Sequence, residues 1–355
     1  SADRTHEVTA FHEHAEWTGV TDSERDAWLT ERATMVTASD AAAIIGEDEH
    51  RSALEVYVDK IMARREPEQL TLSDPRFWGK LLERPILEGV AQYHGWTFRA
   101  GGALLRSRKH SWLGATLDAE IDRGTGVGWE DFEGKTTRVP KGWNEEDGSL
   151  PNRVLVQVQA QLLVTGAPSA VVFALLQGSR PCQIEVDPSP EFHAFIAEAT
   201  EEFIQRVRGM NPPDPDGSAS STRALARLFP HEDGSIVQLA AEAADWTQEV
   251  QKIAEQLKVL EARRDELRNM LRKAIGPSSF GLLPGVIGEK SCWSWRTNKV
   301  GSRVLTPLKR LPEGGGKVHK ALPEPNLEEL LKASVENENA LEPVRFTTKR
   351  RRARR

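Results

Sequence analysis

The chain has 355 residues, of which 39% are hydrophobic and 28% are charged, and its formal net charge is −6 at pH 7. These values are typical of folded globular proteins, and the absence of any run of about eighteen apolar residues excludes a membrane-spanning helix from the sequence. Cys182 and Cys292 are too few for a disulfide framework or a four-thiolate metal site. The first residues lack a secretory signal pattern, so we expect a cytoplasmic protein.

The first third of the chain is expected to be helical. Ser39 is a candidate N-cap for one short helix, and Ser52 begins a capping-box pattern for a second helix that extends to Met62. A third helix is expected over residues 77–94. Pro85 lies inside it, which predicts a kink or a late helix start.

The middle of the chain alternates between strand and helix patterns. Strands are expected over 112–121, 129–136, 170–176 and 182–186, and helices over 154–163 and 190–208. The glycine-rich segment 123–128 predicts a hairpin between the first two strands. This order indicates an α/β (α+β) fold, in which helices flank a mixed sheet.

The residues beyond 210 have a different character. A proline-rich linker at 211–218 is followed by apolar residues at steps of three and four from Ile236 to Leu271, which predict a long heptad helix. Arg264 occupies a position where the pattern requires an apolar residue. Two or more such helices could bury the apolar seam, or the helix could fold back on its own domain.

We therefore expect four parts: a catalytic domain over 1–210, a linker with a short helix over 211–234, the heptad helix over 235–275, and a small mixed extension over 276–355. Within the extension, strands are expected near 292–296 and 344–348 and a helix over 326–334. The chain ends in a basic tail, 349–355. Such a tail is typical of a solvated end or of a phosphate-binding arm.

Asp118, Glu133 and Lys135 are the candidate catalytic residues. Residues two apart on a strand face the same side, so Glu133 and Lys135 project together, and the hairpin can bring Asp118 beside them. Two carboxylates bind a hard divalent cation, and a nearby ammonium can stabilise charge on a phosphate. Spacing alone equally fits a solvent-facing strand, but the apolar neighbours of both carboxylates favour a bound cation.

Glu83 is a further candidate on the expected third helix. It shares an apolar stripe with Ile86, Leu87 and Val90. Two interpretations follow from this position. Glu83 is either a core glutamate paired with an arginine such as Arg84 or Arg99, or a carboxylate directed at a metal ion.

Five motifs in order resemble YqaJ-type viral recombinases, which are relatives of lambda exonuclease in the PD-(D/E)XK nuclease superfamily. The motifs are Arg32 ahead of Thr37-Ala38-Ser39, Glu83 after Trp78-Gly79-Lys80, Ala115-Thr116-Leu117-Asp118, Phe132-Glu133-Gly134-Lys135, and the glutamine run from Gln157 to Gln161. The resemblance covers roughly residues 25–205. It implies a restriction-endonuclease-like core. Leu117 replaces the proline for which the superfamily is named.

The resemblance implies a Mg²⁺ site, in which Mn²⁺ would substitute. Asp118 and Glu133 would bind the metal directly, and Glu83 would do so directly or through water. Lys135 would be the catalytic lysine, and Gln157 would order it.

The resemblance also implies a substrate and a reaction. Arg32 and Ser39 would bind the 5′-terminal phosphate of double-stranded DNA, a role that suits the fork geometry of a guanidinium. The enzyme, a deoxyribonuclease, would digest one strand from 5′ to 3′ and leave a 3′ overhang for a single-strand annealing protein. Trp143, in the segment 137–152, is a candidate to stack on a frayed base. The heptad helix makes homo-oligomerisation a further expectation.

Two other functions remain open at this point. The first is a structure-specific or restriction-type endonuclease on the same fold, because the catalytic residues do not distinguish cleavage at ends from internal cleavage. The second is a non-catalytic interaction protein built around the coiled helix. In that case, replacing Asp118 or Glu133 by alanine would change nothing except stability.

Overall fold

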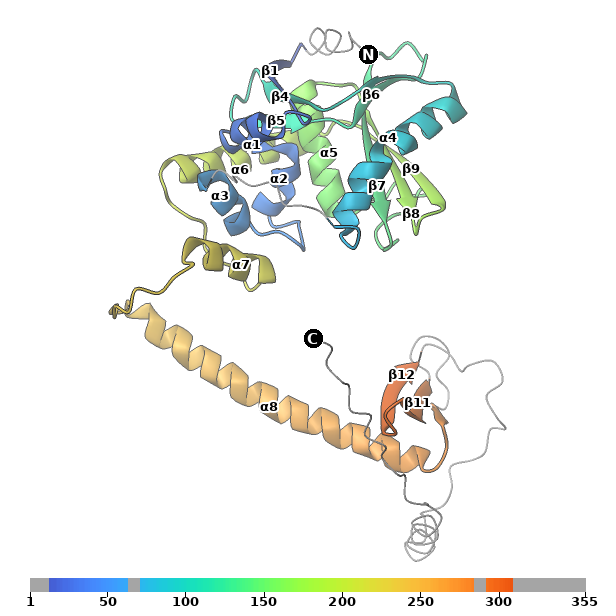
Figure 1. Ribbon diagram of the computed structural model, residues 1–355, viewed down its shortest axis with the longest axis vertical. Coiled ribbons are helices and arrows are strands. Elements are labelled where there is room, and N and C mark those ends of the chain that lie inside the picture. The colour runs from blue at the N-terminus through green and yellow to red at the C-terminus, as the bar shows by residue number, and fades with distance from the viewer. Residues whose placement is uncertain (1–12, 63–70, 284–291, 309–355) are drawn as a thin grey trace, which may run out of the picture. The chain divides into compact units, whose positions relative to one another are not determined.

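Figure 1 shows the computed structural model of the chain, which describes residues 13–62, 71–283 and 292–308. These residues fall into two units divided after Gly234. No helix in the described ranges is both long enough and apolar enough to cross a membrane. The expected helix 326–334, the strand 344–348 and the basic tail lie outside the described residues.

The first unit combines helices with two mixed sheets. Its helices are α1 (Arg25–Ala33), α2 (Ala38–Ile44), α3 (Ala53–Ile61), α4 (Pro75–His94), α5 (Asn152–Thr165), α6 (Pro190–Arg208) and α7 (Ala219–Leu228). Its strands are β1 (Ala15–Thr21), β2 (Val36–Thr37), β3 (Thr97–Ala100), β4 (Ala103–Ser107), β5 (Leu113–Thr116), β6 (Ala119–Asp122), β7 (Glu130–Thr137), β8 (Ala170–Leu176) and β9 (Arg180–Val186). The expected α/β fold class is confirmed.

The sheets have the orders β1-β4-β5-β2 and β3-β6-β7-β8-β9. In the five-stranded sheet β7 and β8 are parallel, and the other neighbours are antiparallel. Helices α4 and α5 pack on opposite faces of this sheet (Figure 1). On the α4 side Leu87 packs with Phe132, and on the α5 side Val158 packs with Val172. Because α5 also packs against α2 and β5, with Val156 in their shared core cluster, it is buried on two sides.

Capping residues explain most helix ends. Ser52 is the N-cap of α3, as expected, and its hydroxyl accepts a hydrogen bond from the Glu55 amide at 3.2 Å. Helix α4 continues through Pro85 and ends at Gly95, whose φ of 73° suits glycine. The expectation that Ser39 caps α2 was wrong. Thr37 is the N-cap, because the Asp40 carboxylate accepts a hydrogen bond from the Thr37 backbone amide at 3.0 Å.

The expected single strand over 112–121 was also wrong. The chain leaves the four-stranded sheet at the end of β5 and enters the five-stranded sheet at the start of β6, so Asp118 lies at the junction. The amides of Gly101 and Gly102 donate 3.0 Å hydrogen bonds to the carbonyls of Asp118 and Leu117. The Gly101–Gly102 segment therefore supplies the donors for the backbone carbonyls of Leu117 and Asp118 at the junction. The expected hairpin is present as the antiparallel pair β6–β7.

The second unit contains helix α8 (Glu242–Ile275) and an antiparallel sheet of β10 (Phe280–Leu282), β11 (Cys292–Thr297) and β12 (Arg303–Leu308). The expected helical start at Ile236 was too early. Glu242 and Asp245 occupy the first turn of α8, where negative charge stabilises the helix dipole. Apolar spacing alone does not start a helix, so Ile236 and Leu239 remain outside it.

Candidate active site

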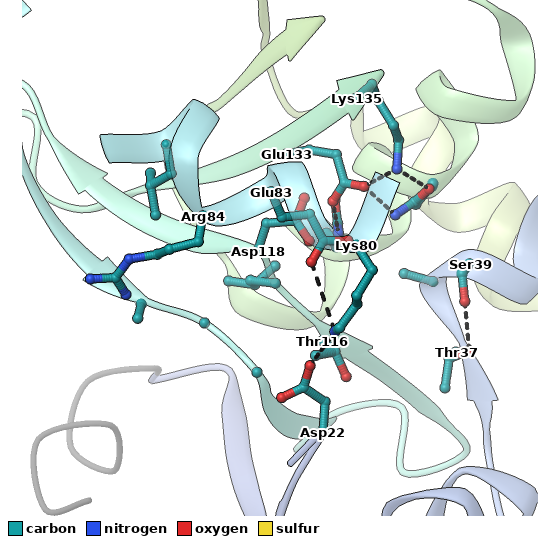
Figure 2. Close-up of a pocket in the computed structure, with 18 of the residues that line it drawn as sticks. Asp22, Thr37, Ser39, Lys80, Glu83, Arg84, Thr116, Asp118, Glu133 and Lys135 are labelled. Atoms are coloured by element: carbon teal, nitrogen blue, oxygen red, sulfur yellow. Dashed lines mark hydrogen bonds and ion pairs between the residues drawn. The ribbon is translucent and has the colours of Figure 1, made fainter. Parts of the chain in front are cut away.

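An open cavity of about 590 Å³ lies in the first unit. Side chains from α4, β7, α5 and the β5–β6 junction line one part of it, and residues of α1 and the start of α2 line another (Figure 2). The predicted site residues Arg32, Ser39, Glu83, Asp118, Glu133, Lys135 and Gln157 all line this cavity. Trp143 is the predicted site residue that does not.

Alternate residues of β7 form hydrogen bonds with residues of α5 that are spaced four apart. The pairs are Asp131 with Thr165 at 2.8 Å, Glu133 with Gln161 at 2.7 Å, and Lys135 with Gln157 at 3.3 Å. Two residues of strand and four residues of helix both advance by about 6 Å, so the two elements stay in register over three pairs. This match places a glutamate and a lysine side by side on one face of the sheet.

Glu133 is buried, and both of its carboxylate oxygens accept hydrogen bonds. Its Oε1 accepts from Lys135 Nζ and, at 2.7 Å, from Gln157 Nε2, and its Oε2 accepts from Gln161 Nε2. Burial alone would lower the pKa of Lys135, but the negative charges of Glu133 and Asp118 outweigh it and raise that pKa. Lys135 is therefore an ammonium group at neutral pH.

Asp118 approaches Glu133 from the β5–β6 junction. Its Oδ2 accepts a 2.8 Å hydrogen bond from the backbone amide of Gly134, the residue between Glu133 and Lys135. Burial, and then the negative charges of Glu133 and Glu83, raise the pKa of Asp118 to about 8. Three carboxyl groups, those of Asp118, Glu133 and Glu83, are thus close enough to repel one another when ionised.

Glu83 faces the same cavity from α4 (Figure 2). Its carboxylate lies 3.8 Å from Lys80 Nζ, and Lys80 also donates to Asp22 at 2.5 Å. Burial raises the pKa of Glu83, and Glu133 adds to this effect while Lys80 opposes it. Arg84, which was one expected partner, instead pairs with Glu88 at 2.5 Å. The position of Glu83 suits a carboxylate directed at a metal.

The carboxylates of this site suit a hard divalent metal ion. Within the residues that the structure describes, no three carboxylate, imidazole or thiol groups form a complete metal cage. Mg²⁺ rarely uses such a cage, because it retains several waters and binds one or two carboxylates together with substrate phosphates. Asp118 and Glu133 would supply those carboxylates, and Glu83 is placed to hold a bound water or the metal.

Arg32, Thr37 and Ser39 form a polar group elsewhere in the cavity. One guanidinium nitrogen of Arg32 donates to Thr37 Oγ1 at 2.7 Å and to Ser39 Oγ at 2.8 Å. The guanidinium also lies 4.3 Å from the centre of the Trp28 ring, which holds it by a cation–π contact. A fixed guanidinium beside an exposed hydroxyl is suited to binding a phosphate.

A buried charge network that we did not predict supports this group. Asp40 is buried at the start of α2 and accepts from Lys60 at 2.7 Å and from Arg51 at 2.6 Å. Burial alone would raise the pKa of Asp40, but Lys60, Arg51 and Arg32 hold it well below its usual range. Gln161 belonged to the glutamine motif, but no role was predicted for it. Its spacing of four residues from Gln157, which puts both on one helix face, was the available signal.

The expectation for Trp143 was wrong. Only 7% of this residue is exposed, and its ring packs in the core cluster that contains Val154 and Leu162 of α5. The segment 137–152 therefore folds back onto α5. A residue that is only 7% exposed does not offer a free ring face on which a base could stack.

The comparison with protein families covers the part of the chain that holds this cavity. Residues 27–168 match the model of the YqaJ-like viral recombinase domain. This part of the chain thus has the sequence features of a YqaJ-like viral recombinase domain. The matched range contains the β7–α5 pairs, the β5–β6 junction and the Arg32 group, and the expected family is thereby confirmed.

Individual proteins are similar to this chain over longer ranges. The uncharacterized protein YqaJ of Bacillus subtilis (strain 168) is 26% identical over 276 residues, which are 77% of this chain and 84% of that protein. Crystal structures of an alkaline exonuclease, LHK-Exo from Laribacter hongkongensis, match 57% of this chain and 100% of theirs. They have 16% identity and TM-scores of 0.40 for the protein alone and 0.42 for its complex with dAMP.

The recombinase domain is a deoxyribonuclease. The family match covers the motif residues, and the geometry brings together two carboxylates, a lysine and a third acidic side chain on one open cavity. These groups are the ones that metal-assisted phosphodiester hydrolysis requires.

Proposed function

We propose that this chain is a Mg²⁺-dependent exonuclease that digests one strand of linear double-stranded DNA from 5′ to 3′. Mn²⁺ would substitute for Mg²⁺. In the cytoplasm of a bacterial host, the 3′ single-stranded overhangs would serve phage-type recombination by a single-strand annealing protein. One observation carries this proposal: the phosphate-binding group and the carboxylate–lysine group line the same cavity.

The shared cavity favours action at a DNA end. A 5′-phosphate held by Arg32 and Ser39 would leave the following phosphodiester to the carboxylates and Lys135. A terminal phosphate carries more negative charge than an internal one, so a fixed guanidinium favours the end over a continuous strand. An endonuclease would not need residues that bind a terminal phosphate beside its catalytic residues.

The chain's own groups would act on charge and orientation. A bound Mg²⁺ would activate the attacking water and neutralise charge on the phosphate. Lys135 Nζ, which is protonated, would donate a hydrogen bond to an oxygen of the phosphate as negative charge develops there. Gln157 and Gln161 hold Glu133 in one orientation, so that no reorganisation is needed when substrate binds.

The test uses linear duplex DNA with or without a 5′-phosphate, in Mg²⁺ or in EDTA. Four proteins are compared: the unaltered chain, Asp118→Asn, Arg32→Lys, and Asp131→Asn as the matched control. Asp131 lies two residues before Glu133 but hydrogen-bonds to Thr165 outside the cavity. We expect Mg²⁺-dependent loss of the 5′-phosphorylated strand, abolished by Asp118→Asn and retained by Asp131→Asn.

Arg32→Lys keeps the positive charge but removes the forked pair of N–H donors that a guanidinium presents to a phosphate. We expect this substitution to raise KM for 5′-phosphorylated ends about tenfold or more. The difference in KM between phosphorylated and unphosphorylated ends should therefore become smaller. Cleavage of closed circles would instead establish the endonuclease function. Absence of cleavage by folded protein with any divalent metal would refute the proposed activity.

A further inference from the structure

Helix α8 has an uncovered apolar seam. Its large side chains are between 45% and 68% exposed and are Trp246, Val250, Ile253, Leu257, Leu260 and Leu267. No described part of the second unit covers them. A continuous apolar stripe of this length in water marks an interaction surface.

The spacing of the seam specifies a helical partner. Steps of three and four place Val250 and Leu257 at heptad position a, and Trp246, Ile253, Leu260 and Leu267 at position d. A repeat of 3.5 residues keeps a seam aligned with another helix of the same repeat, but it drifts across the flat face of a sheet. The partner is therefore a helix with the same period.

The free seam has a definite end. Beyond Leu267, the next seam residue is Leu271, which is partly covered within its own unit, and Ile275 is buried near Gly281. The uncovered part thus extends from Ala243 to Leu267, and its midpoint is residue 255. A second copy of α8 would cover this whole length if the two helices crossed antiparallel at that midpoint.

The antiparallel register centred on residue 255 gives every seam residue a suitable neighbour. Its layers place Leu257 opposite Ile253, Val250 opposite Leu260, Ala243 opposite Leu267, and Arg264 opposite Trp246 of the second copy. The last layer is decisive, because Arg264 is the one charged residue on the seam between Ala243 and Leu267. A guanidinium over an indole ring is a favourable cation–π pair.

The flanking charges agree with this register and not with a parallel one. In antiparallel coiled coils the g positions of the two helices meet, which brings Glu249 beside Arg263 of the second copy. This pair occurs twice in the symmetric dimer. A parallel pairing would instead bring Arg263 beside Arg268 and create repulsion.

We propose that two copies of this chain pair through α8 as an antiparallel two-stranded coiled coil. Seam residues 243–267 form the contact, Glu249 and Arg263 fix its direction, and Arg264 and Trp246 fix its register. The N-terminal ends of the two α8 helices then lie about 40 Å apart, at opposite ends of the coiled coil. Each copy would carry its own nuclease unit, so the proposal does not depend on the proposed exonuclease activity.

The test exchanges the flanking charges in the full chain and measures the dimer by sedimentation equilibrium at low salt. Glu249→Arg and Arg263→Glu each place like charges together twice. We expect each variant to weaken the dimer on the order of tenfold. The double variant, and an equimolar mixture of the two single variants, should regain it because opposite charges meet again. Glu255→Arg, on the outer face of α8, is the matched control and should have no effect.

Each other outcome contradicts the proposal in a distinct way. A stronger dimer with Arg263→Glu would indicate a parallel pairing, because it would relieve the repulsion from Arg268. A dimer that neither charge change weakens would place self-association elsewhere. An unaltered chain that stays monomeric at tens of micromolar would show that another segment or another protein covers the seam.

Discussion

Gln161 fixes Glu133 by a 2.7 Å hydrogen bond from its Nε2 to the Oε2 of the carboxylate. Both side chains are buried, so the loss of one partner would leave a buried polar group without this hydrogen bond. Glu133 is one of the two carboxylates expected to bind the metal, and Gln161 therefore determines its orientation from the neighbouring helix. Groups that orient a metal ligand in this way affect metal affinity strongly.

Replacing Gln161 by leucine should weaken Mg²⁺ binding by about 10- to 100-fold, because Glu133 loses the donor that holds it. The Mg²⁺ concentration needed for half-maximal nuclease activity measures this effect. Gln159→Leu is the matched control on the same helix. Gln159 donates to the Asp187 carbonyl instead, at 2.8 Å, so its loss should lower stability without changing the Mg²⁺ requirement. Equal Mg²⁺ requirements in the two variants would contradict the orienting role.

The metal-free protein should lose stability as pH rises from about 4 to about 8. The folded protein retains a proton on Asp118 up to about pH 8, whereas an unfolded aspartate releases it near pH 4. The folded state thus binds more protons across this window, and the free energy of unfolding falls as pH rises. Urea denaturation in EDTA at several pH values measures the slope.

Asp131 contributes to the same slope, since burial raises its pKa to about 8 as well. Asp118→Asn and Asp131→Asn should each reduce the slope. Added Mg²⁺ should flatten it in the unaltered protein and in Asp131→Asn, because metal binding requires the Asp118 carboxylate. Mg²⁺ should have no such effect in Asp118→Asn. A slope that neither substitution alters would show that these carboxyls are ionised in the folded protein.

Gly101→Ala should disturb Asp118 although residue 101 lies outside the family motifs. A Cβ at Gly101 would lie 1.9 Å from the Leu117 carbonyl oxygen, so the β5–β6 junction would have to move. We expect a loss of about 1–3 kcal/mol in stability together with reduced nuclease activity. Gly89→Ala is the control: a Cβ there meets nothing within 4 Å, and alanine in the interior of α4 should stabilise the protein by about 0.5–1 kcal/mol.

Trp143→Ala should act on stability and not on DNA binding. Removing a buried tryptophan costs about 3–5 kcal/mol, which chemical denaturation can measure. Replacing Trp17, which is 39% exposed, by alanine should lower the free energy of unfolding by less. Quenching of Trp143 fluorescence by DNA in the folded protein would contradict the buried position of the ring.

Local patterns in the sequence determined the elements that carry the chemistry. The two-residue period of β7 put Glu133 and Lys135 on one face, and the four-residue spacing of α5 put Gln157 and Gln161 on another. The heptad of α8 likewise follows from its apolar steps, although the helix begins at Glu242 and not at Ile236. These features depend on neighbours within one strand or one helix, so they can be predicted from the sequence.

Only the tertiary structure decided which of these faces meet. Asp118 reaches Glu133 because the chain changes sheets beside Gly101, and Trp143 is buried because segment 137–152 packs against α5. Asp40 gains Lys60 from a helix 20 residues away. Each of these contacts joins separate segments of the chain, and their geometry is fixed by how helices and sheets pack together. No local period encodes that packing.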